Sequence, residues 1–332
     1  MYQHEKVSLV RDCGERVTAV APVIISASRS TDIPAFHLEW FFKRLERGYC
    51  AWVNPFNQRP SYVSFQNTRC IVFWSKNPEY LIGRLSELKS RGINCYIQFT
   101  LNDYMEEGFE PNVPPIARRI ETFKRLVEIL GKGAVIWRYD PVILTDKLDI
   151  DEHIRRILRI GNELKGYCEK LVFSYADISG YKKVQYNLAH NNIRYNDFSQ
   201  EKMIAFAEKL CQANKVLGFE VATCGEHIIL EEYGIKKNHC IDPLLMARLF
   251  KEDEKLLSWL GYSEMFGAPE TFPKDSGQRA ACGCILSKDI GSYNTCGHGC
   301  VYCYANITPE LSQAGCEQAQ SSCDGESITC QS

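Results

Sequence analysis

Short apolar runs alternate with amphipathic stretches along most of the chain, and this order constrains the fold more than any other feature of the sequence. The apolar runs are rich in Val, Ile, Phe, Tyr and Trp and are nearly continuous, as buried parallel strands are. They lie at residues 23–27, 51–54, 70–74, 94–100, 134–138, 170–175 and 219–223. The stretches between them carry apolar residues at helical spacing, at residues 38–47, 79–91, 117–130, 152–164 and 200–217. This order predicts an α/β fold, a partial or complete TIM-type (β/α) barrel.

The domain boundaries follow from where the alternation starts and stops. We expect residues 1–22 to form an N-terminal extension and residues 23–306 to form the barrel. Beyond residue 306 the chain is rich in Ser, Gln and Gly and poor in apolar residues. Residues 307–332 are therefore predicted to be a flexible tail.

The composition excludes several classes of protein. Hydrophobic residues make up 45% of the 332 residues, which excludes a mostly disordered chain. A formal net charge of −2 provides no basic field, so non-specific nucleic-acid binding is not expected by default. No apolar run approaches the roughly 18 residues of a membrane span, and no secretory signal is visible at the N-terminus. We therefore expect a cytoplasmic protein that does not enter a membrane.

Polar segments follow the predicted strands directly. They lie at residues 28–32, 54–57 and 75–77, at Gln98 with Thr100 and Asn102, and at residues 138–140. In a barrel these positions fall at the C-terminal face, where active sites of this architecture lie. Loops are polar in any protein, because turns favour Asn, Asp and Ser. Five such segments in succession, with Arg and Lys among them, nevertheless indicate a binding face.

The cysteines are numerous and unevenly placed, since eight of the sixteen lie after residue 281. In a reducing compartment such clustering indicates metal binding or catalysis more often than disulfides. Cys296, Cys300 and Cys303 have the spacing C-x3-C-x2-C, and glycines between the first two permit tight turns. Three thiolates on one 4Fe-4S cluster leave the fourth iron open to a chelating substrate. The alternative is a zinc site with His298 or another cysteine as fourth ligand.

A second set of cysteines lies outside this motif. Cys224 ends a predicted strand on the same face, and Cys282 and Cys284 form a close pair whose thiolates could share one metal. Together with Cys240 they could hold an auxiliary iron–sulfur cluster. The alternative is two buried structural thiols and an accidental C-x-C pair.

The segment 293–305, with Tyr302 directly before the third cysteine, resembles the cluster motif of the radical S-adenosylmethionine (SAM) superfamily. It is closest to the spore photoproduct lyase-like branch. Over nearly its full length, and most clearly at residues 26–36 and 282–306, the chain resembles the family of unknown function DUF1848.

In the radical SAM superfamily the cluster motif follows the first strand of the barrel, whereas here it lies near the end of the chain. Residues 28–32, 75–77, 110–121 and 136–142 follow one another in the order of the later units of the lyase-like branch. The resemblance therefore implies a circular permutation, in which the strand before Cys296 lies beside residues 23–27. A barrel permits this, because its first and last strands are neighbours.

The resemblance implies a radical SAM enzyme, in which a reduced cluster cleaves SAM and the resulting 5′-deoxyadenosyl radical abstracts hydrogen from a substrate. An electron donor such as a flavodoxin or ferredoxin is then the expected partner. The substrate is left open: the lyase-like branch suggests nucleic acid, but the net charge gives no independent support. The competing class is a non-catalytic zinc- or iron–sulfur-binding barrel protein.

The contacts to SAM are predicted from side-chain chemistry, because the glycine-rich and Gly-Gly-Glu elements of ordinary radical SAM enzymes are absent. Lys76 is expected to bind the SAM carboxylate, because its ammonium group can pair with it. Hydrogen-bonding partners for SAM are predicted at Ser28, Thr31 and Thr100, and the backbone of Tyr302 near the adenine. Further candidates for SAM or substrate are Arg29, Asp32, Arg138 and Asp140.

Overall fold

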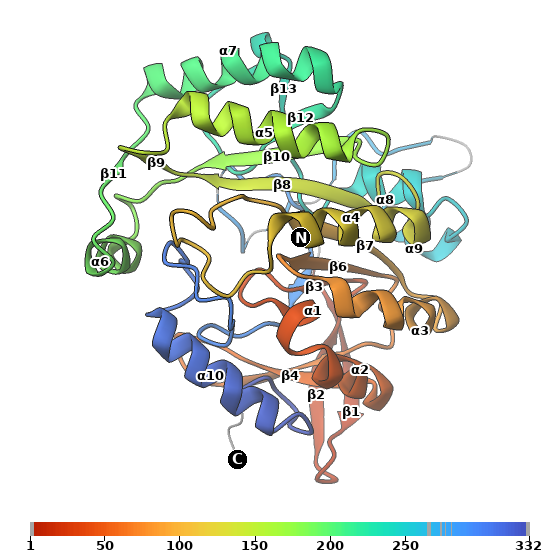
Figure 1. Cartoon of the computed structure of the whole chain (residues 1–332). Coiled ribbons are helices and arrows are strands. Elements are labelled where there is room, and N and C mark those ends of the chain that lie inside the picture. Colours follow the sequence, from red (N-terminus) through yellow and green to blue (C-terminus); the bar gives the residue numbers. More distant parts are fainter. Residues whose placement is uncertain (1–2, 264–266, 273, 276, 280, 330–332) are drawn as a thin grey trace.

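The computed structural model describes residues 3–263, 267–272, 274–275, 277–279 and 281–329 (Figure 1). Within these ranges an eight-stranded sheet has the order β13-β12-β10-β8-β7-β6-β3-β14, and every neighbouring pair is parallel. Its strands are β3 (Ile24–Ala27), β6 (Cys70–Ser75), β7 (Asn94–Thr100), β8 (Val135–Val142), β10 (Lys170–Tyr175), β12 (Glu220–Thr223), β13 (Ile235–Lys237) and β14 (Lys288–Asp289). The sheet is open, with β13 and β14 at its edges, so a closed barrel is not confirmed.

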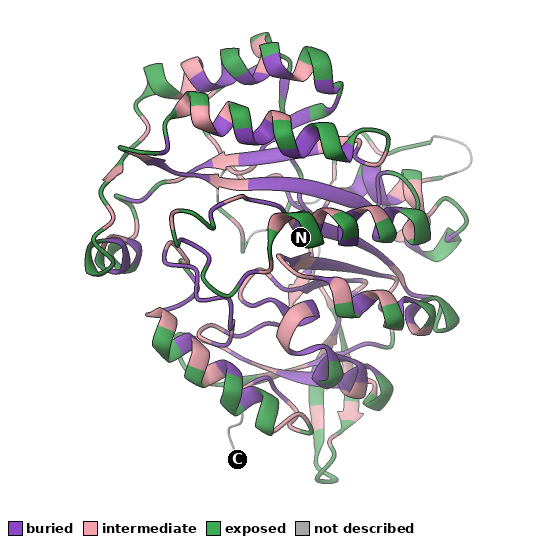
Figure 2. Cartoon of the chain, in the orientation of Figure 1, coloured by how far each residue is buried: buried purple, intermediate pink, exposed green. Residues whose placement is uncertain are grey.

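Both faces of the sheet are covered, which explains why its strands are apolar without alternation. One face packs against α2 (Leu38–Arg47), α3 (Leu85–Ser90), α4 (Ile116–Leu130), α5 (Ile150–Leu164) and α7 (Gln200–Leu217). The other face packs against α8 (Pro243–Leu249) and α9 (Glu254–Trp259) through residues such as Val72 and Ile136. In a closed barrel this second face would form the interior. Here α8 and α9 supply side chains to it, and the sheet stays open. Figure 2 shows the buried strands between helices whose outer faces are exposed.

The strand that precedes the cysteine motif lies where the sequence predicts it. Strand β14 pairs in parallel with β3, with Lys288 opposite Ile25 and Asp289 opposite Ser26. Asp289 reinforces this edge, because its carboxylate accepts hydrogen bonds from the hydroxyls of Ser26 (2.7 Å) and Ser28 (2.9 Å). The predicted neighbourhood of the strand before Cys296 and residues 23–27 is confirmed.

A second sheet contains a strand that the sequence analysis assigned to the barrel. Its order is β1-β2-β5-β4, formed by β1 (Glu5–Val10), β2 (Arg16–Ala21), β4 (Tyr49–Val53) and β5 (Pro60–Ser64). The predicted strand at 51–54 therefore belongs to the antiparallel pair β4–β5, and residues 54–57 form its turn, with Phe56 exposed. That polar segment does not lie at the edge of the parallel sheet. Residues 5–21 of the expected extension form the β1–β2 hairpin of this sheet.

The C-terminal segment differs from the expected flexible tail. Helix α10 (Pro309–Ser321) begins at Thr308, whose hydroxyl accepts from the backbone N–H of Leu311. Ala319 and Ile328 are buried in the main core. The carboxylate of Glu326 pairs with Arg11 at 2.8 Å. The composition of this segment did not predict the helix, because the side chains that α10 buries, Ser312, Cys316 and Ala319, are small and form no strong apolar stripe.

The remaining elements are short. They are α1 (Ile33–Phe36), α6 (Lys182–His190), the pair β9 (Leu144–Thr145) and β11 (Tyr195–Asn196), and the 3-10 helices η1 (Glu79–Arg84) and η2 (Glu231–Tyr233). None of the helices in the described ranges combines the length and apolar character that crossing a bilayer requires.

Candidate functional site

Four of the predicted polar segments meet at the carboxyl edge of the parallel sheet. The backbone N–H of Lys76, after β6, donates to Asp32, after β3, at 2.8 Å. Asn102, after β7, donates from its amide to the carbonyl of Asp140 at 3.0 Å and accepts from the backbone N–H of Asp140 at 2.9 Å. Carboxyl ends of parallel strands converge in this way in α/β proteins, and ligands bind there.

The cysteine loop, residues 296–303, is fixed to this edge by side chains from other segments. The imidazole of His298 lies 2.7 Å from the carboxylate of Asp32, which also caps α1 through the backbone N–H of Ala35. The amide of Asn112 donates to the carbonyl of Gly297 at 2.9 Å. Gly299 has a φ of +66°, a conformation that favours glycine. His298 therefore holds the loop in position through its contact with Asp32.

Asp32 is held as an anion inside the protein. Burial raises its pKa, but the hydrogen bonds from His298, Ser75 and the backbone of Lys76 outweigh this effect, so the pKa lies below its usual value. Both carboxylate oxygens are used in these contacts. Asp32 thus holds the loop in place. A direct contact of Asp32 with SAM or substrate stays a prediction.

The three thiols of the cysteine loop are shielded from water, with Cys300 buried and Cys296 and Cys303 half-buried. Burial raises the pKa of all three thiols, and the charge of Lys76 counteracts part of this rise at Cys300 and Cys303. As the structure stands, no three His, Cys, Asp or Glu side chains of the described residues have the arrangement of a metal site. The loop nevertheless carries three shielded thiols, and the charge of Lys76 acts on two of them, Cys300 and Cys303.

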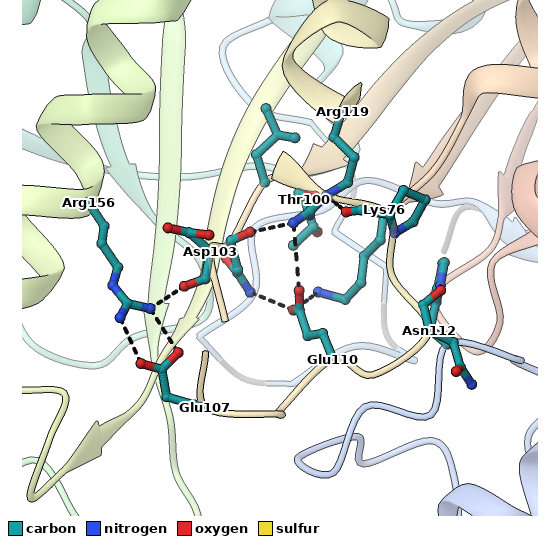
Figure 3. A network of polar contacts seen from close by, with 12 residues as sticks. Lys76, Thr100, Asp103, Glu107, Glu110, Asn112, Arg119 and Arg156 are labelled. Carbon is teal, nitrogen blue, oxygen red and sulfur yellow. Dashed lines mark hydrogen bonds and ion pairs between the residues drawn. The ribbon is translucent and has the colours of Figure 1, made fainter. Parts of the chain in front are cut away.

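Lys76 lies beside this loop, but its ammonium group is already paired (Figure 3). It donates to Glu110 at 2.7 Å and to the hydroxyl of Tyr302 at 2.9 Å. Asn102 donates to the same Glu110 oxygen at 3.2 Å, and the Tyr302 hydroxyl donates to it as well. The guanidinium of Arg119 lies 4.0 Å from the other Glu110 oxygen. We call Lys76, Asn102, Glu110, Arg119 and Tyr302 the Glu110 network.

The electrostatics of the Glu110 network follow from its burial. Burial raises the pKa of Glu110, but Lys76 and Arg119 outweigh it and lower this pKa to about 2. Burial lowers the pKa of Lys76, whereas Glu110 and Cys300 raise it above its usual value. The network therefore contains two cations and one anion. The second Glu110 oxygen accepts no hydrogen bond.

The other predicted SAM contacts are distributed unevenly. The hydroxyl of Ser28 is bound to Asp289, so it serves the β3–β14 edge. The hydroxyl of Thr31 is buried without a hydrogen-bond partner. The backbone carbonyl of Thr100 accepts from Arg119 at 3.3 Å. The buried hydroxyl of Thr31 is therefore open to a ligand.

The four cysteines of the second set lie near one another at one side of the sheet. Cys224 follows β12, Cys240 follows β13, and Cys282 and Cys284 precede β14. The sulfurs of Cys224 and Cys240 lie 3.2 Å apart, and the Cys284 thiol is within hydrogen-bonding reach of Cys240 and Cys282. A hydrogen bond with Cys284 lowers the pKa of Cys282 to about 7. We call these four residues the thiol cluster.

Two predicted arginines face the thiol cluster. Arg138 donates to the sulfur of Cys240 at 3.0 Å and pairs with Asp140. Arg29 is within hydrogen-bonding reach of Cys284. Both guanidinium groups also lie over the ring of Trp74, at 5.0 Å for Arg29 and 5.3 Å for Arg138. Arg29 and Arg138 therefore both lie between the thiol cluster and Trp74, and Asp140 joins them through its ion pair with Arg138.

Several residues of the edge were not predicted from the sequence. Glu110, Asn112 and Arg119 lie in or after the segment between β7 and α4, which has no periodicity. Glu226 accepts from the backbone N–H of Tyr175 at 2.9 Å, and burial raises its pKa to about 7. The sequence indicates a site residue most clearly where a polar segment directly follows a strand, and these residues lie farther along the chain from the preceding strand.

Taken together, the open parallel sheet and its cysteine-rich carboxyl edge define an α/β protein with two groups of thiols at the place where such folds bind ligands. The family described as Domain of unknown function (DUF1848) matches residues 24–305, and the chain belongs to this family. No curated protein matches the chain.

Proposed function

We propose that the protein is a radical SAM-type enzyme whose cysteine loop binds a 4Fe-4S cluster through Cys296, Cys300 and Cys303. The observation that carries the proposal is the placement of these three shielded thiols at the carboxyl edge of a parallel sheet, with Cys300 and Cys303 within electrostatic range of Lys76. When bound and reduced, such a cluster supplies the electron that cleaves SAM to a 5′-deoxyadenosyl radical.

The donor set is suitable for such a cluster. Three thiolates are the ligands expected for a cubane with one open iron. Buried polar atoms without a hydrogen-bond partner lie around the loop, at Thr31, Glu110 and Asn306. Buried polar atoms of native proteins are nearly always paired, so these atoms favour a ligand at this place.

The Glu110 network is suited to the amino-acid end of SAM. Lys76 and Arg119 carry two positive charges against one on Glu110, so the network has a net charge of +1 and can balance a carboxylate. The free oxygen of Glu110 can accept from the α-amino group. We therefore propose that Lys76 contacts SAM as a member of this network.

The fold favours this proposal as well. Strand β14, which leads into the cysteine loop, lies beside β3 at the edge of the sheet, although it follows β3 in the chain. We propose that the parallel sheet is a partial TIM-type barrel, circularly permuted relative to the radical SAM core. The reductant would be a flavodoxin or ferredoxin, and a cytoplasmic location would keep the thiols reduced.

Anaerobic reconstitution with iron and sulfide tests the proposal. We expect a brown protein whose absorption is bleached by dithionite, and 5′-deoxyadenosine after addition of SAM and reductant. The single variants Cys296→Ala, Cys300→Ala and Cys303→Ala should each lose the iron of this site, whereas Cys211→Ala, in α7, should keep it. Unchanged iron in all three variants, or a colourless zinc protein, would refute the proposal.

A further inference from the structure

We propose that the thiol cluster binds one divalent metal ion, Zn²⁺ or Fe²⁺, through the four thiolates of Cys224, Cys240, Cys282 and Cys284. This site is separate from the cysteine loop, and the inference does not depend on the proposed radical SAM activity. Four sulfur ligands select zinc or iron over magnesium or calcium, which prefer oxygen.

The spacing of the sulfurs favours a single ion over an iron–sulfur cubane. Two thiolates on one tetrahedral Zn²⁺, each about 2.3 Å from the metal, lie about 3.8 Å apart. The sulfurs of Cys224 and Cys240 are 3.2 Å apart, so these two would separate by about 0.6 Å to match two ligands of one ion. In a cubane each cysteine binds a different iron, which places the ligand sulfurs farther apart. Contact between neighbouring sulfurs is therefore typical of a mononuclear site.

The buried Arg138 and the half-buried Arg29 favour negative charge at this place. A guanidinium group in the interior costs several kcal/mol unless a counter-charge is present. One terminal nitrogen of Arg29 is buried without a hydrogen-bond partner, and the negative groups acting on its guanidinium are Cys284, Asp289 and Cys240. Four thiolates and a divalent ion carry a net charge of −2 (−4 plus +2). The charged groups that face it are Arg29, Arg138 and Arg279, with the carboxylate of Asp140 paired to Arg138.

Neutral hydrogen-bond donors point to the same conclusion. The amide of Asn238 donates to the Cys240 sulfur at 3.1 Å, and the backbone N–H of Ile241 donates to the Cys284 sulfur at 3.3 Å. Charged acceptors form stronger hydrogen bonds than neutral thiols, so these donors stabilise thiolates. The ring of His239 lies against Gly283, where an added Cβ would be 2.8 Å from it. This ring covers the turn that joins Cys282 and Cys284.

The experiment uses the full chain with Cys296, Cys300 and Cys303 replaced by Ala, so that the cysteine loop cannot contribute. The reduced, metal-free protein is titrated anaerobically with Co²⁺, and then with Zn²⁺. We expect about one Co²⁺ per chain, with the visible bands of a tetrahedral site and thiolate-to-cobalt charge transfer, and displacement by Zn²⁺. The added pair Cys282→Ser and Cys284→Ser should abolish these bands, whereas Cys211→Ser should not.

Arg29 provides a second test that leaves all four thiols in place. Arg29→Met should weaken Co²⁺ binding about 10- to 100-fold, as the loss of partners around metal ligands does. Arg248→Met, at an exposed ion pair with Glu169, is the matched control and should bind as the parent does. Circular dichroism verifies that each variant is folded.

Three results would overturn the inference. The first is the absence of thiolate-to-cobalt bands in the folded parent. The second is a content of about four irons with sulfide that depends on Cys284, which would indicate a cubane. The third is a disulfide between Cys224 and Cys240 in protein prepared without air. Each of these can occur whether or not the cysteine loop binds its own cluster, so the two proposals fail separately.

Discussion

Replacing Lys76 with Met should destabilise the protein even in the absence of any cofactor. The substitution keeps the length of the side chain and removes the charge that pairs with Glu110 at 2.7 Å. The side chains of Lys76 and Glu110 are only 16% and 2% exposed, so solvent screens the pair weakly. Breaking a buried ion pair costs about 3–5 kcal/mol.

The remaining partners reduce this cost. Tyr302 and Asn102 still donate to Glu110, and Arg119 remains 4.0 Å away. A pKa of about 2 for Glu110, against 4.5 for an ordinary Glu, corresponds to about 3 kcal/mol of stabilisation, of which Lys76 is the larger source. We therefore expect Lys76→Met to lower the free energy of unfolding by about 2–4 kcal/mol.

The pH dependence fixes the sign of the effect. The folded pKa of Glu110 is below its unfolded value, so its contribution is fully present above pH 4.5 and is lost as the pH falls toward 2. The pKa of Lys76 is raised above 10.5, so its own contribution persists below that pH. The difference between parent and variant should therefore be constant from about pH 5 to 9 and should shrink below pH 4.5.

A double-mutant cycle measured by urea unfolding tests this reasoning. Lys76→Met, Glu110→Gln and the double variant should give a coupling energy of about 1–3 kcal/mol, since the double variant leaves no unpaired charge. Lys132→Met, at an exposed lysine of the α4–β8 turn, controls for the loss of a lysine. A coupling below about 0.5 kcal/mol, or a Lys76→Met variant as stable as the parent, would refute the buried pair.

Three further predictions concern other parts of the molecule. Glu226→Gln should reduce the loss of stability between pH 5 and 8, because the raised folded pKa of Glu226, about 7, stabilises the protein below pH 4.5 and this stabilisation is lost as the pH rises through 7. Urea unfolding at pH 5 and pH 8 measures the effect, and parent and variant would lose the same stability between the two if Glu226 titrated normally. Gly291→Ala should cost about 1–3 kcal/mol, because its Cβ would lie 1.8 Å from the Ser28 hydroxyl, whereas Gly83→Ala, with open space, should cost less; equal thermal melts would contradict the tight β3–β14 contact. Ile328→Ala should cost about 2–5 kcal/mol if the C-terminal segment is packed, against little for the exposed Ile307→Ala, and chemical denaturation distinguishes this from a flexible tail.

The parallel sheet could be predicted because its strands are buried on both faces. Strands β6, β7 and β10 appear as continuous apolar runs, and the helices between them have clear apolar stripes. Strand β4 has the same appearance, since four of its five residues are buried, yet it belongs to the other sheet. Composition alone does not identify the partner of a buried strand. Whether the sheet closes into a barrel could not be predicted from the sequence either, because it depends on where α8 and α9 pack.

The convergence of the thiols could be predicted in part from their positions, whereas their polar partners could not. Cys224 and Cys240 follow the neighbouring parallel strands β12 and β13, so the topology brings these two to one end, whereas the approach of Cys282 and Cys284 depends on how the loop before β14 folds. Glu110 lies in an aperiodic segment, and its place beside Lys76 depends on how residues 101–115 fold back over the edge. The sequence identified the cation and missed the anion that neutralises it.

Net charge illustrates the same limit. The chain carries −2 overall, which gave no reason to expect an anionic ligand. At the sheet edge, however, Arg119 is buried and Lys76 and Arg29 are half-buried, and the Glu110 carboxylate balances only one of the charges of Lys76 and Arg119. The negative groups that act on Arg29 are Cys284, Asp289 and Cys240, and one of its terminal nitrogens has no hydrogen-bond partner. A shielded cation favours a counter-charge, so we expect thiolates or a bound ligand to supply further negative charge here, and both proposals draw on this local excess of cations.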